Sequence, residues 1–158
     1  MPKIITTIEV DAPIEIAFDL SRSIEFHAYT QTHRNEVAIK GKTSGLINLG
    51  EIVTWKAKHF GINQRLSVRI TKLDKPFIFR DTMIEGAFKR FDHDHIFEQH
   101  NGLVKITEVF DYESPFSFVG RVFDFLILKK YMTNFFSHRN KEIKKALESD
   151  KWKDFLNQ

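Results

Sequence analysis

Apolar and polar residues alternate through the middle of the chain, and this pattern predicts a β-rich core. Runs that alternate, or that are rich in β-branched residues, are separated by turn signals containing Gly, Asn, Asp or Pro. The strands predicted in this way cover residues 3–10, 35–40, 51–60, 64–73, 77–84, 90–99 and 103–112. Because successive strands with short connections pair as a meander, we expect one antiparallel sheet.

Helical spacing of apolar residues is confined to segments near the two ends of the sequence. Pro13 suits the first turn of a short helix, and a second short helix is predicted over residues 24–29. The segment from Val119 to Glu148 has no Pro and no Gly after Gly120, and its apolar stripe predicts one long helix. Arg139 stands where this stripe requires an apolar residue.

The order of these elements defines the expected fold class. One strand, two short helices, a run of strands and a long final helix are typical of an α+β domain, with helices against one face of an antiparallel sheet. We expect a single domain over residues 1–158, because no repeat or Pro/Gly/Ser-rich linker divides the chain. A curved meander that grips a helix leaves space for a pocket.

The dipeptide Asn101-Gly102 fixes the register of the last two strands, because it is a favoured centre of a two-residue type I′ hairpin. His95 then lies opposite Glu108, and His93 lies opposite Phe110. Alternate side chains share a face of a sheet, so one inner face is expected to collect eight residues. They are Phe91, His93, His95, Phe97, Ile106, Glu108, Phe110 and Tyr112.

Glu108 and His95 are the most specific pair on this inner face. Directly opposed residues have Cβ atoms about 5 Å apart, which suits a carboxylate–imidazole hydrogen bond. Asp81 is expected on the same face beside Phe91 if residues 85–87 form the preceding turn. Its strand neighbours Phe77, Phe79 and Met83 are expected there too. On the strand over residues 51–60, the side chains that alternate toward the inside are Trp55, Ala57 and His59.

Three interpretations of the two histidines stay open at this level. His93 and His95 are core residues satisfied by Glu108, Asp81 or water, or they are polar anchors in an apolar ligand pocket. The third interpretation is metal or acid–base chemistry, because His-x-His presents two imidazoles on one side of a strand. A lone His-x-His does not by itself predict a metal, so no metal ion and no cofactor is expected. Signatures of a serine nucleophile, a phosphate loop and a dinucleotide fold do not occur.

Composition favours the pocket interpretation and limits the expected partners. Phe accounts for 16 of the 158 residues, against two Trp and three Tyr, so the aromatic bulk is mostly apolar. The net charge is only +3, and the lysines of the last third are interspersed with acidic residues, so no nucleic-acid partner is expected. There is no Cys, no signal-peptide pattern and no apolar run of about 20 residues. We therefore expect a cytoplasmic protein and no membrane contact.

An ordered set of motifs extends over nearly the whole chain. Its members are Ala12-Pro13-Ile14-Glu15 with Phe18, Gly50 to Trp55 with His59-Phe60-Gly61, Pro76-Phe77 with Phe79 and Asp81-Thr82-Met83, Gly86 with Phe88, Phe91 with His93, His95 and Phe97, Gly102, Glu108, Tyr112, Pro115-Phe116, Gly120-Arg121 and Arg139. This set resembles a bacterial ligand-binding branch of the SRPBCC superfamily, which includes START-type lipid-transfer proteins, polyketide cyclases and pollen-allergen-like proteins. The sequence departs from that branch at Glu108, where Asp is usual, and at Phe91, where Trp is common.

The resemblance implies a helix-grip fold, in which a curved seven-stranded antiparallel sheet surrounds a long C-terminal helix and two short helices follow the first strand. It implies binding or transport of a small hydrophobic ligand such as a lipid or polyketide. The expected ligand-binding residues are Trp55, His59, Phe77, Phe79, Asp81, Phe91, His93, His95, Phe97, Glu108, Phe110, Tyr112, Phe125 and Leu128.

Two other functions stay open beside ligand binding, and fold does not decide among them. The first is a cyclase or dehydratase in which His95 is the acid–base residue and Glu108 holds its tautomer. The second is an interaction module that uses the C-terminal helix.

Overall fold

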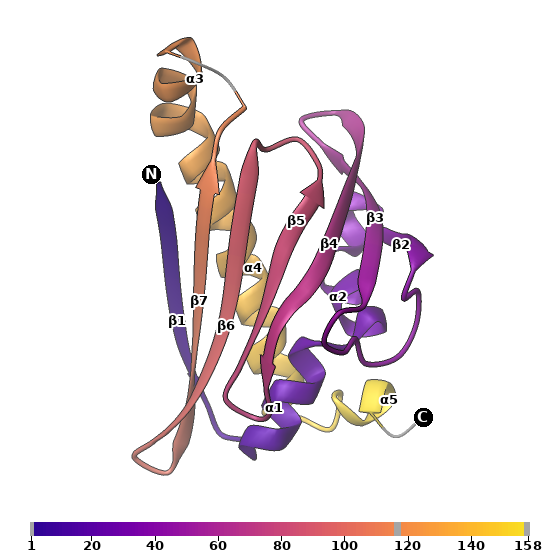
Figure 1. Cartoon of the computed structure of the whole chain (residues 1–158). Coiled ribbons are helices and arrows are strands. Elements are labelled where there is room, and N and C mark those ends of the chain that lie inside the picture. The colour runs from indigo at the N-terminus through magenta and orange to yellow at the C-terminus, as the bar shows by residue number, and fades with distance from the viewer. Residues whose placement is uncertain (1, 116–117, 157–158) are drawn as a thin grey trace.

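Within residues 2–115 and 118–156, which the computed structural model describes, seven strands form one antiparallel sheet (Figure 1). Nothing is described for the side chains at positions 118, 120, 124 and 125. The strands are β1 (Lys3–Val10), β2 (Val37–Gly41), β3 (Ile52–His59), β4 (Ile62–Asp74), β5 (Ile78–Glu85), β6 (Arg90–His100) and β7 (Leu103–Glu113). Their order across the sheet is β1-β7-β6-β5-β4-β3-β2. The expected α+β class and seven-stranded sheet are confirmed.

Helices occupy the segments where helical spacing predicts them. They are α1 (Ile14–Ser21), α2 (Ile24–Thr30), α3 (Phe118–Phe123) and α4 (Lys129–Leu147). The long final helix is present, but a π-helical turn over Asp124–Leu128 separates α3 from α4. A 3-10 turn (Thr32–Arg34) and the short α5 (Lys153–Leu156) were not predicted, because each is too short to show a period. Among the described residues, no helix combines the length and hydropathy needed to cross a membrane.

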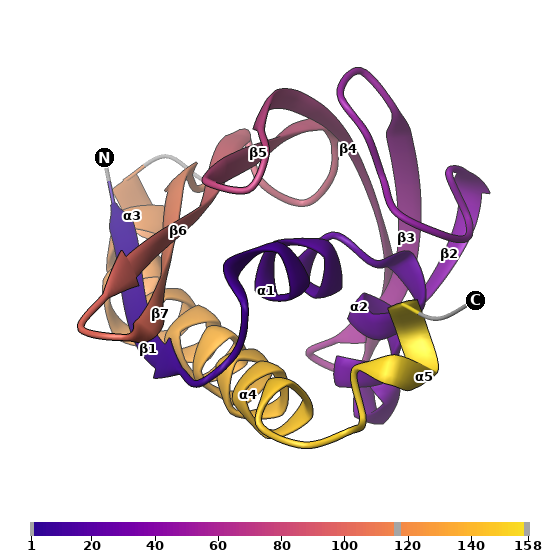
Figure 2. The same ribbon diagram turned by 90° about the horizontal axis from the view of Figure 1, so that it is seen from below.

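The sheet curves strongly, and the helices lie on its concave side. Figure 2 shows the strands as an open arc from β1 to β2, with α1, α2 and α4 within the arc and across its opening. Part of the bend comes from β4, whose register against β5 shifts between Ser67 and Val68 and again between Ile70 and Lys72. Such irregularities increase local twist and bending, so one strand can serve both arms of the arc.

The hairpin between β6 and β7 has the predicted turn and register. Asn101 and Gly102 both have positive φ, at 51° and 77°, as a type I′ turn requires. His95 pairs with Glu108 and His93 pairs with Phe110. Alternate residues of both strands are buried, so the hairpin fixes which side chains face the concave side.

The register between β5 and β6 differs from the expected one. Asp81 pairs with His93, and not with Phe91, because the connection is longer than the expected three-residue turn at 85–87. The shift is two residues, which preserves the alternation of faces. Asp81 therefore still points to the concave side, one step closer to the histidines.

Phe18 anchors α1 to the sheet. Its side chain is fully buried and makes edge-on ring contacts with Phe79 of β5 and Phe97 of β6, with centroids 5.5 and 5.3 Å apart. Edge-to-face aromatic contacts add to the stabilisation that burial provides. The helix thereby closes one end of the sheet.

We expect Phe18→Ala to lower the free energy of unfolding by about 3–5 kcal/mol, because it removes a buried ring and leaves a cavity. Urea unfolding monitored by circular dichroism measures this change. Phe77→Ala is the matched control: Phe77 is 53% exposed, so its loss should cost less than about 1 kcal/mol. Equal losses in the two variants would contradict the role assigned to Phe18.

Candidate functional site

A cavity of about 350 Å³ lies against the concave face of the sheet. Its volume is in the range of small-molecule sites, roughly 300–1,000 Å³. Its walls come from strands β3 to β7, from α1 and α2, and from the final helix. Apolar side chains dominate the lining. One group of polar side chains surrounds His93 and His95, and a second group comprises His27, Glu36, His59 and Tyr131.

Many of the residues expected at the ligand site line this cavity. They are Trp55, His59, Phe79, Asp81, Phe91, His93, His95, Phe110 and Leu128. Sequence analysis missed other lining residues, among them His27, Glu36, Tyr131, Phe135 and Phe136. On α4, Phe135 belongs to the predicted apolar stripe but was not assigned to the cavity, and Tyr131 and Phe136 lie next to members of the stripe. His27 on α2 and Glu36 in a loop had no periodic signal.

Phe77 was wrongly placed in the cavity wall. It precedes β5 and lies in a turn, where its backbone N–H donates to the carbonyl of Asp74. The alternation of β5 therefore does not extend to Phe77, and its side chain is 53% exposed. Phe125 is a further expected wall residue, and its side chain lies outside the described part of the chain.

Phe97, Tyr112 and Glu108 are buried on the expected face but do not line the cavity. Phe97 packs under Phe18, and the Tyr112 ring lies 5.2 Å from that of Phe110. Glu108 is 1% exposed and sits behind the two histidines. These residues support the site and do not border its free space.

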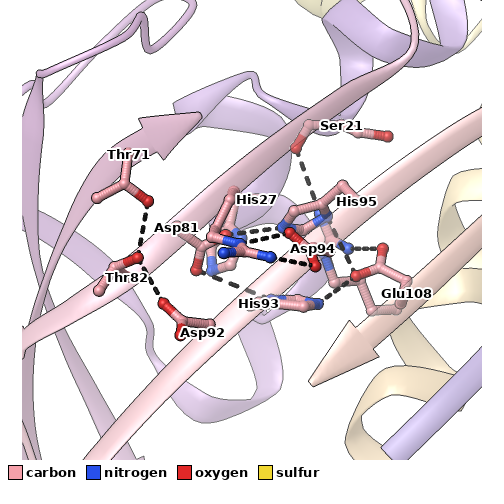
Figure 3. A network of polar contacts seen from close by, with 12 residues as sticks. Ser21, His27, Thr71, Asp81, Thr82, Asp92, His93, Asp94, His95 and Glu108 are labelled. Atoms are coloured by element: carbon pink, nitrogen blue, oxygen red, sulfur yellow. Dashed lines mark hydrogen bonds and ion pairs between the residues drawn. The ribbon is translucent and has the colours of Figure 1, made fainter. Parts of the chain in front are cut away.

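The polar wall brings together five side chains from four elements. Asp81 comes from β5, His93 and His95 from β6, Glu108 from β7 and Arg139 from α4. The strand residues follow from register, because His93 pairs with Asp81 while His95 pairs with Glu108. Figure 3 shows Asp81 and Glu108 on opposite sides of the two imidazoles.

Each imidazole lies between the two carboxylates. His95 Nε2 is 2.8 Å from Asp81 Oδ1, and His95 Nδ1 is 3.1 Å from Glu108 Oε2. His93 Nε2 is 2.5 Å from the same Glu108 oxygen, and His93 Nδ1 is 3.8 Å from Asp81 Oδ2. The approach of both rings to Glu108 is oblique, so these contacts are ion pairs by distance without regular hydrogen-bond geometry.

Arg139 completes the cluster from the helix side. Its Nη1 donates to Glu108 Oε1 in a short charge-assisted contact, and its Nη2 donates to the carbonyl of Ser21 at 3.3 Å. The predicted partners of Glu108 were histidines, with His95 directly opposite it, and Arg139 was not expected there. The signal for Arg139 was present in the sequence, as the one charged residue within the apolar stripe of the final helix.

Burial opposes every charge in this cluster, and neighbouring charges decide the outcome. Burial would raise the pKa of Glu108, but Arg139 and the two histidines hold that pKa well below its ordinary value. Burial would also raise the pKa of Asp81, which the same two histidines lower. For His95, burial lowers the pKa, but Glu108 and Asp81 outweigh it and raise the pKa.

Burial and the charge of His95 together lower the pKa of His93. The carboxylates favour the protonated form of His95, whereas burial favours the neutral form of His93. One protonated imidazole and Arg139 match the two carboxylates in charge. These charges balance within the cluster, which is what allows them to be buried.

Comparison with known proteins identifies the fold. No protein-family model and no curated protein matches the sequence. Solved structures match over most of the chain, including protein TTHA0849 of Thermus thermophilus, with 16% identity, a TM-score of 0.75, and coverage of 92% of this chain and 97% of that one.

Two further matches carry informative names. Ginseng major latex-like protein 151 of Panax ginseng has 13% identity and a TM-score of 0.66, with 94% of this chain and 98% of that one covered. A START superfamily protein of Mycobacterium smegmatis has 11% identity and a TM-score of 0.68, with 92% and 97% covered. The protein therefore shares the fold of these structures, and the helix-grip fold that the resemblance implied is confirmed.

We expect Arg139→Met to lower the free energy of unfolding by about 3–5 kcal/mol, because it leaves the Glu108 carboxylate buried with too little positive charge. Chemical unfolding measures the loss. Adding Glu108→Gln should recover much of it, since the uncompensated charge is then gone. Additive losses in the double variant would contradict this explanation.

The matched control for Arg139→Met is Arg80→Met. Arg80 binds Asp94 through two contacts of 2.6 and 2.8 Å, but on the solvent side of the sheet. Exposed ion pairs contribute little to stability, so this variant should lose much less than Arg139→Met.

His59 provides a pH-dependent contribution to stability. Its Nδ1 lies 2.8 Å from the hydroxyl of Tyr131. Burial and, more weakly, Arg34 lower its pKa, while Glu36 acts in the opposite direction. A depressed histidine pKa in the folded state means that the unfolded state takes up more protons below the ordinary value of about 6.5. The stability linked to neutral His59 is therefore complete above that pH and is lost as pH falls.

We expect His59→Gln to show a shallower loss of stability than the wild type between about pH 7.5 and about pH 5.5. Thermal melts across this range measure the slope. His100→Gln, at an exposed position of the β6–β7 hairpin, should follow the wild type. Parallel wild-type and His59→Gln slopes would show that protonation of His59 is not coupled to folding.

Proposed function

We propose that this protein binds or carries a small hydrophobic molecule in the cavity beside His93 and His95. The observation that supports this most directly is the cavity itself: a volume of about 350 Å³ with mostly apolar walls and a few polar groups, among them His93 and His95. Pockets of this make-up bind ligands by burying apolar surface, while a few polar groups fix the orientation.

The position of the polar groups suggests the shape of the ligand. Trp55, Phe91 and Leu128 supply apolar walls, whereas His93, His95 and Asp81 lie together. A molecule with a hydrophobic body and one oxygen-bearing end fits this division. Lipids, polyketides and similar metabolites belong to this class, which is also the class implied by the resemblance to START-type and polyketide-cyclase proteins.

The contacts of His95 favour binding over the alternative cyclase or dehydratase reaction. A general acid or base must exchange a proton with the substrate through a ring nitrogen. In this protein Nε2 of His95 is 2.8 Å from Asp81 and Nδ1 is 3.1 Å from Glu108. Both nitrogens are engaged by carboxylates, and the ring is stacked on Phe79 with centroids 4.1 Å apart.

We expect the purified protein to bind a hydrophobic fluorescent dye such as anilinonaphthalene sulfonate, and members of a lipid and polyketide panel to displace it. Val68→Phe should weaken dye and ligand binding at least tenfold, because Val68 is buried and lines the cavity, so the added ring fills it. Fluorescence titration measures the affinities, and native mass spectrometry identifies bound molecules.

Val37→Phe is the control for this substitution. Val37 lies on edge strand β2, is 48% exposed and does not line the cavity, so binding should stay unchanged. Equal binding by the wild type and Val68→Phe would place the dye outside the cavity and refute the proposal. Turnover of a displacing compound, lost in His95→Gln, would instead support the enzymatic alternative.

A further inference from the structure

Both imidazoles of the polar wall lie between the same two carboxylates, with one ring nitrogen toward each. His93 presents Nε2 to Glu108 and Nδ1 to Asp81, and His95 presents Nδ1 to Glu108 and Nε2 to Asp81. Each ring therefore has one nitrogen toward each carboxylate (Figure 3). Neutral imidazole is a donor at one nitrogen and an acceptor at the other, so the two carboxylates compete for the ring protons.

Glu108 is held in place behind both rings. Its Oε1 is bound by Arg139 and its Oε2 lies within 2.5 Å of His93 and 3.1 Å of His95. It is buried behind the rings and cannot turn away from them. Once the proton between His95 Nε2 and Asp81 is displaced and the remaining N–H groups face Glu108, the lone pairs of His93 Nδ1 and His95 Nε2 both point to Asp81.

A carboxylate behind a histidine is the usual outer-shell partner of a metal-binding imidazole. It fixes the tautomer and the orientation of the ring and increases the basicity of the coordinating nitrogen. Here one carboxylate, Glu108, serves two rings, and Arg139 fixes the carboxylate. We propose that Asp81, His93 and His95 bind one divalent transition-metal ion.

The distances suit such an ion. The candidate ligand atoms of Asp81, His93 and His95 all lie within 4.8 Å of one another. Bonds of about 2.0–2.1 Å in a tetrahedral site place ligand atoms about 3.3 Å apart. The separations of 2.8 Å to His95 and 3.8 Å to His93 fall on either side of that value. Small side-chain rotations therefore suffice, and the cation takes the place of the proton that otherwise joins His95 to Asp81.

The donor set selects the kind of metal. Two imidazoles and one carboxylate suit Zn²⁺, Co²⁺ or Fe²⁺ better than Ca²⁺ or Mg²⁺, which prefer oxygen ligands. All three residues line the cavity, so three protein ligands leave an open coordination position toward it. An oxygen atom of the cavity ligand can occupy that position. This inference goes beyond hydrophobic binding, which does not depend on it.

The test uses the full-length protein after treatment with a chelator, titrated with Co²⁺ alone. We expect one ion per chain by native mass spectrometry, together with a visible absorption band of low-symmetry Co²⁺. Zn²⁺ should displace the ion and abolish the band. Asp81→Ala and His93→Ala should each lower the affinity at least 100-fold.

A second pair of histidines provides the control. His33 and His138 are both exposed on the surface, and their rings lie 4.7 Å apart, so they are the natural site of adventitious binding. His138→Ala should leave the Co²⁺ affinity unchanged. Loss of binding in His138→Ala, with retention in His93→Ala, would overturn the proposal.

Proton NMR of the wild-type protein with Co²⁺ makes the test independent of how the variants fold. Paramagnetically shifted, exchangeable imidazole N–H signals should belong to His93 Nε2 and His95 Nδ1, the nitrogens that face Glu108. No binding of Co²⁺ or Zn²⁺ at millimolar concentration, or shifts assigned to other histidines, would refute the metal site. Dye binding by the chelator-treated protein reports separately on the cavity, so the two proposals can fail independently.

Discussion

The buried ion pair between Arg139 and Glu108 connects the final helix to the inner face of the sheet. Both side chains are nearly inaccessible to solvent, so neither charge is tolerable without the other. The pair restricts how α4 crosses the concave face, because the guanidinium contacts both Glu108 and the Ser21 carbonyl. Everything on the polar wall depends on this arrangement, since Glu108 in turn holds the two imidazoles.

The cavity results from a sheet too curved to close tightly on its helices. Aromatic side chains occupy the concave face in contact with one another, as in the cluster of Phe88, Phe91 and Phe110, where ring centroids are 4.8 to 5.7 Å apart. Rings packed by their edges form stable walls. The polar cluster around His93 and His95 then interrupts this aromatic surface.

Local patterns predicted the strands and the β6–β7 register because those features depend on nearest neighbours in the chain. Asn101 and Gly102 set the turn, and period-2 alternation then placed His95 opposite Glu108. The longer β5–β6 connection has no comparable signal, and there the predicted partner of Asp81 was wrong by two residues. The prediction that Phe77 lines the cavity was wrong for a related reason, because alternation does not show where a strand begins.

The α+β class, the curved antiparallel sheet and the inward-facing side chains of the last hairpin could all be predicted from the amino-acid sequence. Those properties follow from hydrophobic periodicity and turn chemistry, which act over a few residues. Three features became apparent only in three dimensions: Arg139 neutralises Glu108, Asp81 reaches His95, and Phe97 and Tyr112 lie behind the cavity wall. These contacts join residues far apart in the chain. They depend on how the elements pack in three dimensions, and no local sequence pattern predicts them.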